Sequence, residues 1–212
     1  MIPKIIHQIW LGNPSNRPIE AMESWKAVYP DWKYMLWTEE NMPNLQNQKQ
    51  FDSVTDYPGK ADILRYEILK EYGGFYADAD TLAKERIPES FLEYPCFCAY
   101  ENEKARPGLV ANTFLASQKE GLVIQKLIDK IHTYSPKYLS KSTRPPSWQI
   151  LGPLLLTEIL KETSSEECVV FPSHYFLPVH CTGVTYEGTD KSYAEHFWGS
   201  TGSARQFHRE IY

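Results

Sequence analysis

The stretch from residue 60 to residue 81, KADILRYEILKEYGGFYADADT, carries the clearest pattern of apolar and polar positions in the chain. Four apolar residues in it recur at spacings of three and four positions: Ala61, Leu64, Ile68 and Leu69. This spacing predicts a helix with one apolar face. Gly73 and Gly74 end the helix, because glycine adopts a left-handed backbone without steric cost. Residues 75–77 (FYA) then predict a short strand.

The same pattern continues along the rest of the chain as alternating strands and helices. Strands are expected at residues 4–10, 33–37, 97–100, 113–116 and 169–171. Helices are expected at residues 19–29, 121–132 and 152–160. Because the two kinds of element alternate without internal repeats, the predicted fold is a single α/β domain over residues 1–212.

Three segments are expected to depart from this alternation. Thr38, followed by two glutamates, is expected to cap a short helix. Residues 41–58 are polar and predict an irregular segment at the surface. Residues 135–147 combine prolines with basic residues, and we expect a mobile basic loop there.

Composition and charge narrow the class of protein. A hydrophobic content of 42% and an aromatic content of 14% indicate a packed globular core. The net charge of −5 argues against a nucleic-acid partner, because binding phosphates needs clustered Lys and Arg. No apolar run approaches the ~20 residues of a membrane span, and no signal peptide opens the chain. The four cysteines fit neither a disulfide framework nor a zinc spacing, so we expect reduced thiols and a cytoplasmic location, with disulfides as the alternative.

The candidate chemistry lies in the helix–turn–strand unit. Asp78 and Asp80 stand one residue apart where the predicted strand ends, and such a pair can converge on one divalent cation that neutralises a diphosphate. Asp62 and Arg65 are three residues apart and therefore share a face of the preceding helix. Taken alone, the acid pair also fits a capped turn, and Asp62 with Arg65 also fits a surface ion pair.

Three segments in order along the chain carry a family resemblance: IPKIIHQIWLG, then ADILRYxILxxYGGxYxDxD, then HFWGS, where x marks any residue. In this combination the chain resembles the DXD glycosyltransferases of family 32 and the glucosyltransferase domains of large clostridial toxins. The resemblance runs from residue 2 to about residue 201. It implies a GT-A fold, which is a Rossmann-like, nucleotide-binding mixed sheet flanked by helices.

The resemblance also implies an activity. We expect transfer of a hexose or deoxyhexose from a UDP-sugar, with Mn²⁺ or Mg²⁺ and retention of the anomeric configuration, to a hydroxyl of a glycan or protein-linked glycan. UDP-glucose is the default donor. The basic loop, with Lys141 and Arg144, is expected to line the acceptor entrance. The small size is similar to compact virus-encoded members, for which the host cytoplasm is the expected location; a domain of a longer polypeptide is the alternative.

Matched residue by residue, the resemblance implies a donor-binding set. Trp10 stands where the family stacks an aromatic ring on uracil, with the Ile9 backbone as a partner of the base. Its alternative is a core tryptophan. Asp62 and Arg65 match the acid and base that hold the donor sugar hydroxyls and the diphosphate. Tyr76 is expected over the ribose, with a place in the core as its alternative.

The resemblance also implies a metal set and a catalytic set. Asp78 matches an acid that reaches the ribose or the metal through water, and Asp80 matches the direct metal ligand. His196 is expected to complete the metal shell, and Ser200 to close on the diphosphate. Asn112 matches a position near the acceptor. The expected catalytic set is Asp62, Arg65, Asp78 and Asp80.

Two other functions remain open from the sequence. DADT at residues 78–81 fits the D-x-D-x-T signature of haloacid-dehalogenase phosphatases, in which the first aspartate is the nucleophile. That chemistry needs a downstream acid cluster, and only scattered acids follow residue 81. The second is a nucleotide-sugar or glycan-binding module without turnover, against which the intact set of acids and base argues.

Overall fold

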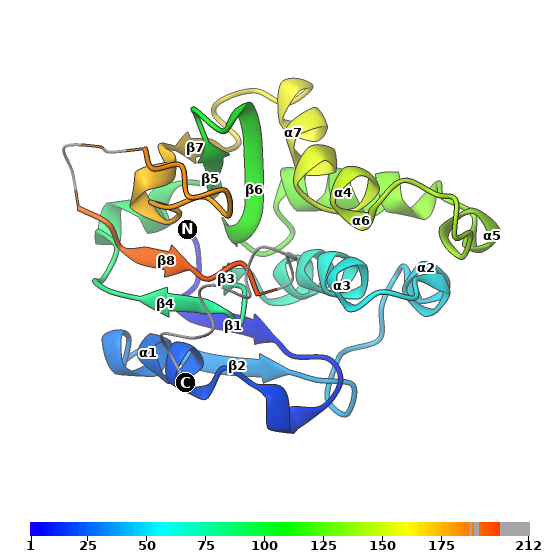
Figure 1. Ribbon diagram of the computed structural model, residues 1–212, viewed down its shortest axis with the longest axis horizontal. Coiled ribbons are helices and arrows are strands. Elements are labelled where there is room, and N and C mark those ends of the chain that lie inside the picture. Colours follow the sequence, from blue (N-terminus) through cyan, green and yellow to red (C-terminus); the bar gives the residue numbers. More distant parts are fainter. Residues whose placement is uncertain (187, 189–190, 200–212) are drawn as a thin grey trace.

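A computed structural model describes residues 1–186, 188 and 191–199 of the chain. Its main sheet has six strands in the order β2-β1-β3-β6-β5-β7 (Figure 1). The strands are β1 (Ile5–Ile9), β2 (Lys33–Trp37), β3 (Gly74–Ala77), β5 (Cys96–Asn102), β6 (Arg106–Ser117) and β7 (Val169–Phe171). β1 runs parallel to β2 and β3, whereas β6 runs antiparallel to β3 and β5. The predicted mixed α/β architecture is therefore confirmed.

Helices cover both faces of this sheet. They are α1 (Ile19–Val28), α2 (Gln48–Ser53), α3 (Tyr57–Tyr72), α4 (Leu122–His132), α5 (Pro136–Leu139), α6 (Ser147–Ile150) and α7 (Pro153–Lys161). In Figure 1, α3, α4 and α7 lie on one side of the sheet, and α1 lies on the other. A second, two-stranded sheet pairs β4 (Thr81–Ala83) with β8 (Ala194–His196) and packs beside α1.

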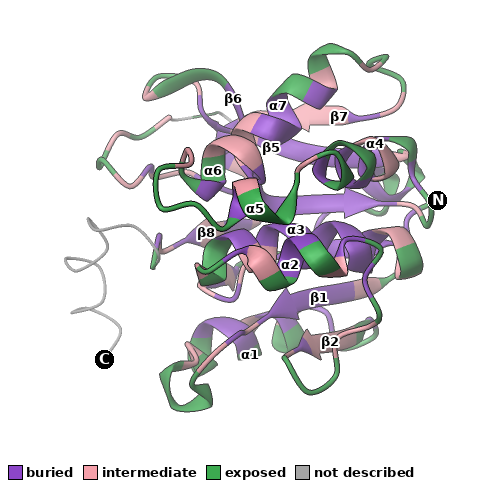
Figure 2. Cartoon of the chain, turned by 90° about the vertical axis from the view of Figure 1, so that its right-hand side faces the viewer, coloured by how far each residue is buried: buried purple, intermediate pink, exposed green. Residues whose placement is uncertain are grey.

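The two-residue period of β3 divides the core into two clusters. Phe75 packs edge-on against Trp25 of α1, with ring centres 5.5 Å apart. Tyr76 points to the other face and packs in the cluster that contains Leu64 of α3. Because both faces of β3 are covered, all four of its residues are buried. The edge strands β2 and β7 are only partly buried, as Figure 2 shows.

The predicted helix–turn–strand unit is confirmed, with a longer helix than expected. α3 begins at Tyr57 because Asp56 caps it, accepting a hydrogen bond from the backbone N–H of Gly59 at 2.8 Å. It ends at Tyr72, and Gly73 has a φ of 62°, a backbone conformation that glycine adopts without strain. The other predicted helices and strands lie within a few residues of their expected bounds, except that β6 extends well beyond residues 113–116.

The prediction that residues 41–58 are irregular and lie at the surface is wrong. The segment contains α2, on which Phe51 is 4% exposed. Two of its polar side chains are buried because they bind backbone carbonyls in α4 and just after it. Asn47 Nδ2 donates to the carbonyl of Ile128 at 3.0 Å, and Gln50 Nε2 donates to the carbonyl of Tyr134 at 3.1 Å.

The predicted helix cap at Thr38 is also wrong. The backbone N–H of Thr38 donates to Asn41 Oδ1 at 2.7 Å, and Asn41 Nδ2 donates to the carbonyl of Leu36 at 2.9 Å. An asparagine side chain that bonds to nearby backbone in this way stabilises a turn rather than a helix.

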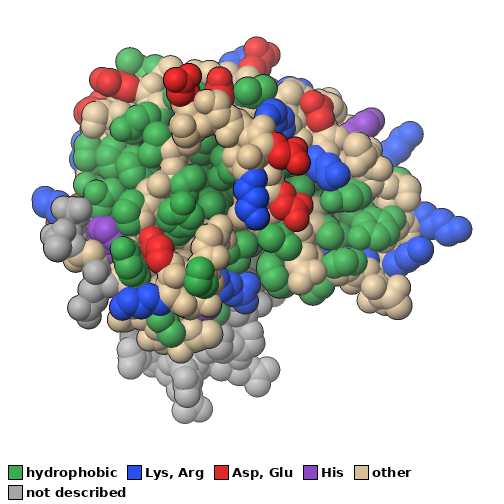
Figure 3. Space-filling view, turned by 90° about the horizontal axis from the view of Figure 1, so that it is seen from above, with side chains coloured by type: hydrophobic (Ala, Val, Ile, Leu, Met, Phe, Trp, Pro, Cys, Tyr) green, Lys and Arg blue, Asp and Glu red, His purple; other side chains and the backbone are tan. Residues whose placement is uncertain are grey.

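The basic segment at residues 135–147 is more ordered than the expected loop. α5 begins there, capped by Ser135, whose side chain accepts from the backbone N–H of Tyr138. Arg144 points inward to an ion pair with Asp56, and only 8% of its side chain is exposed. Lys and Arg side chains do gather at the end of the molecule where α2 and α5 lie, as Figure 3 shows.

The four cysteines are free thiols, as expected. Three of them nevertheless meet in the core, because β5 and β7 are neighbouring parallel strands. The Sγ atom of Cys168 lies 3.2 Å from that of Cys96 and 3.8 Å from that of Cys98. Among the described residues, no helix combines the length and the apolar composition needed to cross a membrane.

Candidate active site

Two pockets open where the carboxyl ends of β1 and β3 meet. The first, here called the Trp10 pocket, has a volume of about 630 Å³ and is lined by Trp10, which follows β1, and by Asp80, which follows β3. The second, here called the Trp148 pocket, has a volume of about 340 Å³. Arg65 and Asp78 line both pockets, so they stand at the junction between them.

Arg65 is the centre of this junction. Its Nη2 lies 3.0 Å from Asp62 Oδ1 and 3.2 Å from Asp78 Oδ1. Its Nη1 donates to the carbonyl of Asn112 at 2.7 Å, and its guanidinium carbon lies 4.5 Å from the centre of the Tyr76 ring. The Arg65 side chain is 5% exposed, so a buried cation is held between two carboxylates and an aromatic face. The pair formed by Asp62 and Arg65 is therefore not a surface ion pair.

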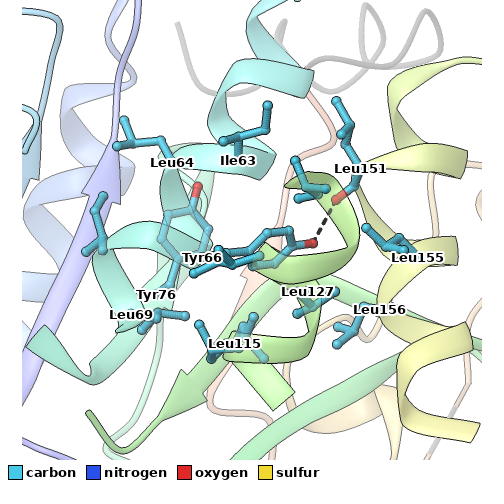
Figure 4. Close-up of a cluster of buried hydrophobic side chains, with 14 of the residues drawn as sticks. Ile63, Leu64, Tyr66, Leu69, Tyr76, Leu115, Leu127, Leu151, Leu155 and Leu156 are labelled. Atoms are coloured by element: carbon cyan, nitrogen blue, oxygen red, sulfur yellow. Dashed lines mark hydrogen bonds between the residues drawn. The ribbon is translucent and has the colours of Figure 1, made fainter. Parts of the chain in front are cut away.

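Asp62 is held by a buried hydrogen-bond chain. Its Oδ1 accepts from Asn112 Nδ2 at 2.8 Å, and the same amide nitrogen donates to the hydroxyl of Tyr66 at 3.0 Å. The Tyr66 hydroxyl donates in turn to the carbonyl of Leu151 at 2.9 Å (Figure 4). Burial raises the pKa of Asp62 to about 7, although the charge of Arg65 opposes this.

Gly152, the residue after Leu151, leaves room for the Asp62 carboxylate. A Cβ atom on Gly152 would lie 2.8 Å from Asp62 Oδ2 and 3.0 Å from the backbone of Trp148. The missing side chain thus allows the loop before α7 to approach the carboxylate closely. The loop and the Asp62 side chain therefore fit together only when residue 152 has no side chain.

Asp78 is fixed by both its backbone and its side chain. The backbone carbonyl accepts from Gln8 Nε2 at 3.1 Å and from the Thr81 hydroxyl at 2.6 Å. The side-chain Oδ1 accepts from the Tyr76 hydroxyl at 2.7 Å. Because Gln8 lies on β1, the strand beside β3, the parallel pair itself anchors the turn that carries both aspartates.

Asp80 lies against the segment that follows β8. The β4–β8 ladder pairs Thr81 with His196, and this register brings His196 Nε2 to 3.3 Å from Asp80 Oδ1. Asp80 Oδ2 accepts from the backbone N–H of Gly199 at 2.6 Å. Burial acts to raise the pKa of Asp80, but the charge and hydrogen bonding of His196 lower it to about 2. The carboxylate is therefore ionised at neutral pH.

Asp78, Asp80 and His196 fit a divalent cation. Each offers one ligand atom, and these atoms all lie within 4.8 Å of one another. The Nδ1 atom of His196 is buried without a hydrogen-bond partner among the residues that the structure describes. Two carboxylates with one imidazole suit Mn²⁺, and the carboxylates alone suit Mg²⁺.

Comparison with known proteins agrees with this geometry. The family described as the glycosyltransferase sugar-binding region containing the DXD motif matches residues 15–97, which include both the Asp62–Arg65 pair and the two aspartates. Inositol phosphoceramide mannosyltransferase 2 of Schizosaccharomyces pombe is 34% identical over 170 residues, which is 71% of this chain. The chain therefore carries the DXD region that defines this glycosyltransferase family. It spans 46% of the length of that relative.

Solved structures of glycosyltransferases share the fold of this chain. A glycosyltransferase involved in the glycosylation of the major capsid of PBCV-1 superposes with a TM-score of 0.58 at 11% identity, covering 98% of both chains. The UDP-bound glycosyltransferase domain from the YGT toxin superposes with a TM-score of 0.57 at 9% identity, covering 80% of this chain and 79% of that one. At these identities the likeness shows the fold alone, and it confirms the expected GT-A class.

The other residues expected in the donor site differ in where the structure places them. Ile9 and Trp10 line the Trp10 pocket, with Trp10 Nε1 donating to the carbonyl of Asn13 at 2.9 Å. Tyr76 also borders that pocket but is 1% exposed, with its hydroxyl bound to Asp78. Ser200 lies outside the described residues.

Several residues at the two pockets were missed by the sequence analysis. Tyr57 is 57% exposed in the Trp10 pocket, beside Gly12. Glu101, Arg106 and Trp148 line the Trp148 pocket. Tyr57 and Trp148 are aromatic residues at the starts of two helices, and this position was a signal that the sequence offered. Glu101 of β5 and Arg106 of β6 gave no such signal.

Proposed function

We propose that this chain transfers a hexose from a UDP-sugar to a hydroxyl of a glycan acceptor, with Mn²⁺ or Mg²⁺ and with retention of the anomeric configuration. The observation that carries the proposal is the convergence of Asp78, Asp80 and His196 between the Trp10 pocket and Arg65. A UDP-bound toxin domain with the same fold and a relative named as a mannosyltransferase support a nucleotide-sugar donor.

The uridine would occupy the Trp10 pocket. The exposed face of Trp10 offers a stacking surface for the base, and the backbone of Ile9 offers polar atoms at its edge. Tyr57, which also lines this pocket, adds a second aromatic side chain. Tyr76 acts below this pocket by holding both Arg65 and Asp78 in place.

The diphosphate would lie at the aspartate pair. Asp78, Asp80 and His196 would hold the cation, which when bound neutralises negative charge on the leaving UDP. Arg65 is already fixed by four contacts, so it can place positive charge beside the diphosphate without rearranging. Preorganised charge of this kind is usually the largest electrostatic contribution to catalysis.

The donor sugar would lie at the junction of the two pockets, where Asp62 can accept hydrogen bonds from its hydroxyls. Asp62 Oδ1 is already bound to Arg65 and Asn112, which suits orientation of the sugar better than nucleophilic attack on it. The acceptor hydroxyl would then lose its proton to the leaving phosphate on the same face of the sugar. This arrangement accounts for retention without a protein nucleophile.

The phosphatase alternative is not favoured. That chemistry gives no role to Asp62 and Arg65, which here form a buried cluster with Asp78. Thr81, the threonine of the signature, is fully buried. Its hydroxyl donates to the carbonyl of Asp78 at 2.6 Å and accepts from Trp25 Nε1 at 3.1 Å. Thr81 therefore stabilises the turn.

We also propose that residues 1–212 act as one catalytic domain. The cytoplasmic location stays a prediction.

Release of UDP from UDP-sugars in the presence of Mn²⁺ tests this function. UDP-glucose, UDP-galactose and UDP-N-acetylglucosamine form the first set, and GDP-mannose forms a second arm because the relative is named a mannosyltransferase. We expect turnover that stops when a chelator removes the cation. Asp80→Asn should lower the rate about 100-fold or more, because it removes a carboxylate ligand of the cation that neutralises the leaving diphosphate.

Asp129→Asn is the matched control, since Asp129 is an exposed acid on α4, remote from both pockets. Asp80→Asn that turns over at the wild-type rate would contradict the proposal. Binding of the donor with no turnover under any condition would favour a binding module, and hydrolysis of a general phosphate ester would favour a phosphatase.

A further inference from the structure

The Trp148 pocket meets the Trp10 pocket at Arg65 and Asp78. On the proposed function, the nucleotide fills the Trp10 pocket and the donor sugar lies at this junction. The acceptor would then approach through the Trp148 pocket. Its volume of about 340 Å³ is at the small end of the range for ligand pockets and suits a compact group.

Three side chains from separate elements form the outer wall of the pocket: Glu101 of β5, Arg106 of β6 and Trp148 of α6. The hairpin pairs Asn102 with Arg106, which brings the acid and the base together. Arg106 Nε lies 3.3 Å from Glu101 Oε1, and the guanidinium carbon lies 4.9 Å from the centre of the Trp148 ring. The wall is thus a continuous surface of carboxylate, guanidinium and indole.

Exposure divides this wall into a fixed part and an open part. Glu101 is 5% exposed and is also bound to His180 Nε2 at 3.0 Å, so its carboxylate is held in place. By contrast, 42% of the Arg106 side chain is exposed, and Trp148 is 38% exposed. A ligand therefore finds a rigid acceptor of hydrogen bonds beside a cation and an aromatic face that are both accessible.

The wall is also fixed relative to the donor side. Ser147, the residue before Trp148, donates from its hydroxyl to Asp56 Oδ1 at 2.8 Å. Asp56 also pairs with Arg144 and caps α3, the helix that carries Asp62 and Arg65. A bound ring on Trp148 would therefore have a defined position relative to the donor sugar.

An indole face beside a carboxylate and a planar guanidinium suits a polyhydroxylated six-membered ring. The C–H bonds on one face of such a ring carry slight positive charge, which the negative face of an indole attracts. Neighbouring hydroxyls can donate to the carboxylate and accept from the guanidinium in pairs. An alkyl chain in this position would cover the Arg106–Glu101 ion pair without replacing the hydrogen bonds that water makes to it, and is therefore disfavoured.

We propose that Glu101, Arg106 and Trp148 form the acceptor subsite, which binds a sugar or cyclitol ring and directs one ring hydroxyl towards the Arg65–Asp78 junction. The proposal rests on the proposed function and deepens it. A sugar ring and a cyclitol ring share this chemistry, so the test has an arm for each.

Saturation-transfer NMR with the full chain, UDP and Mg²⁺ tests the subsite, because Mg²⁺ does not broaden resonances as Mn²⁺ does. The ring probes are methyl α-mannopyranoside, methyl β-glucopyranoside and myo-inositol. We expect at least one probe to bind in the millimolar range. Trp148→Ala should weaken its binding about tenfold through loss of the stacking face. Arg106→Gln, which keeps much of the side-chain volume, should weaken it through loss of charge.

Tyr94→Ala is the control for aromatic truncation, because Tyr94 is 37% exposed and lies outside both pockets. It should bind the probes as the wild type does. Equal probe binding by Trp148→Ala and wild type would overturn the proposal, as would binding of no ring probe by wild type that has UDP bound. Stronger binding of a glycoside supports a sugar acceptor, and stronger binding of myo-inositol supports a cyclitol acceptor.

A separate calorimetric titration of UDP and Mg²⁺ distinguishes failure of this inference from failure of the proposed function. If UDP binds and no ring does, the acceptor subsite is wrong while the donor site stands. If the ring probes bind to the wild type and more weakly to Trp148→Ala, but UDP does not bind, the proposed function is wrong while the ring-binding site stands.

Discussion

His196 Nε2 lies 3.3 Å from Asp80 Oδ1, and the backbone pairing of β4 with β8 holds it there. The third ligand of the candidate cation site thus comes from a segment far along the chain. Because Thr81 pairs with His196, the ladder itself fixes the distance between the acid and the imidazole. The site depends on strand register as well as on the DXD motif.

His196→Gln is expected to weaken the binding of Mn²⁺ in the presence of UDP by about tenfold, because an imidazole ligand is lost. Isothermal titration of Mn²⁺ into chain saturated with UDP measures this. His132→Gln is the control, since His132 is exposed at the end of α4. An unchanged Mn²⁺ affinity in His196→Gln would leave Asp78 and Asp80 as the only protein ligands among the three.

Arg65→Lys is expected to destabilise the fold and to stop turnover. An ammonium group cannot reproduce the contacts that the planar guanidinium makes with Asp62, Asp78 and the Asn112 carbonyl. Leaving two buried carboxylates poorly paired should lower the free energy of unfolding by about 3 kcal/mol. Urea denaturation and the UDP-release assay measure the two effects.

The control for Arg65→Lys is Arg86→Lys, at an exposed pair with Asp31 in which 43% and 53% of the side chains are accessible. Exposed pairs contribute about 1 kcal/mol or less, so this variant should be close to wild type. Equal losses of stability in the two variants would mean that burial of Arg65 does not matter.

Trp10→Ala is expected to raise the dissociation constant for UDP about tenfold, because stacking of a base on an aromatic side chain contributes ~1–3 kcal/mol. Trp10→Phe keeps an aromatic face and should retain most of the affinity. Fluorescence or calorimetric titration with UDP and Mn²⁺ measures both constants. If the alanine variant binds UDP as tightly as the phenylalanine variant, the base does not stack on residue 10.

His7 should make the stability depend on pH in a defined window. Burial lowers its pKa to about 4, against about 6.5 in an unfolded chain. Its Nε2–H donates to the carbonyl of Gly73 at 2.8 Å, and its Nδ1 accepts from Trp37 Nε1 at 3.1 Å, so the folded state needs the neutral ring. Between these two pKa values the unfolded chain binds more protons than the folded chain. The free energy of unfolding therefore falls as pH falls through the window, by up to about 3 kcal/mol.

Denaturation of wild type and His7→Gln across the window isolates this contribution. The raised pKa of Asp62 acts in the opposite direction, because there the folded state binds the extra proton, but it is present in both proteins and cancels in the difference. The difference in unfolding free energy should shrink as pH falls from neutral to about 4. A difference that is independent of pH would show that His7 does not titrate in this way.

The sequence alone predicted the parts of the fold and of the site whose residues lie close together in the chain. The apolar spacing before Gly73, the strand at residues 75–77 and the acid pair after it all lie within a short stretch, so one period and one turn signal describe them. Arg65 and Asp62 follow from the same helix. The burial of Asp62 and Arg65 could not be predicted in this way, because it depends on Asn112 of β6 and on the hydrogen bond between Asn112 and Tyr66.

Two of the errors concern polar residues whose partners are distant in sequence. Asn47 and Gln50 look like surface residues until the carbonyls at the end of α4 are placed beside them. Arg144 looks like part of a basic loop until Asp56 is placed beside it. In each case the free energy of burying a polar group is offset by a hydrogen bond to a group that no local pattern reveals.

The distance along the chain between Asp80 and His196 also has a consequence for synthesis. Domains acquire structure from the N-terminus as the ribosome extends the nascent polypeptide. The parallel pair of β1 and β3 can form once β3 has emerged, whereas β8 is translated much later. Between these two stages the growing chain therefore holds the two acids without the imidazole, and the third ligand joins the site only when β8 is made.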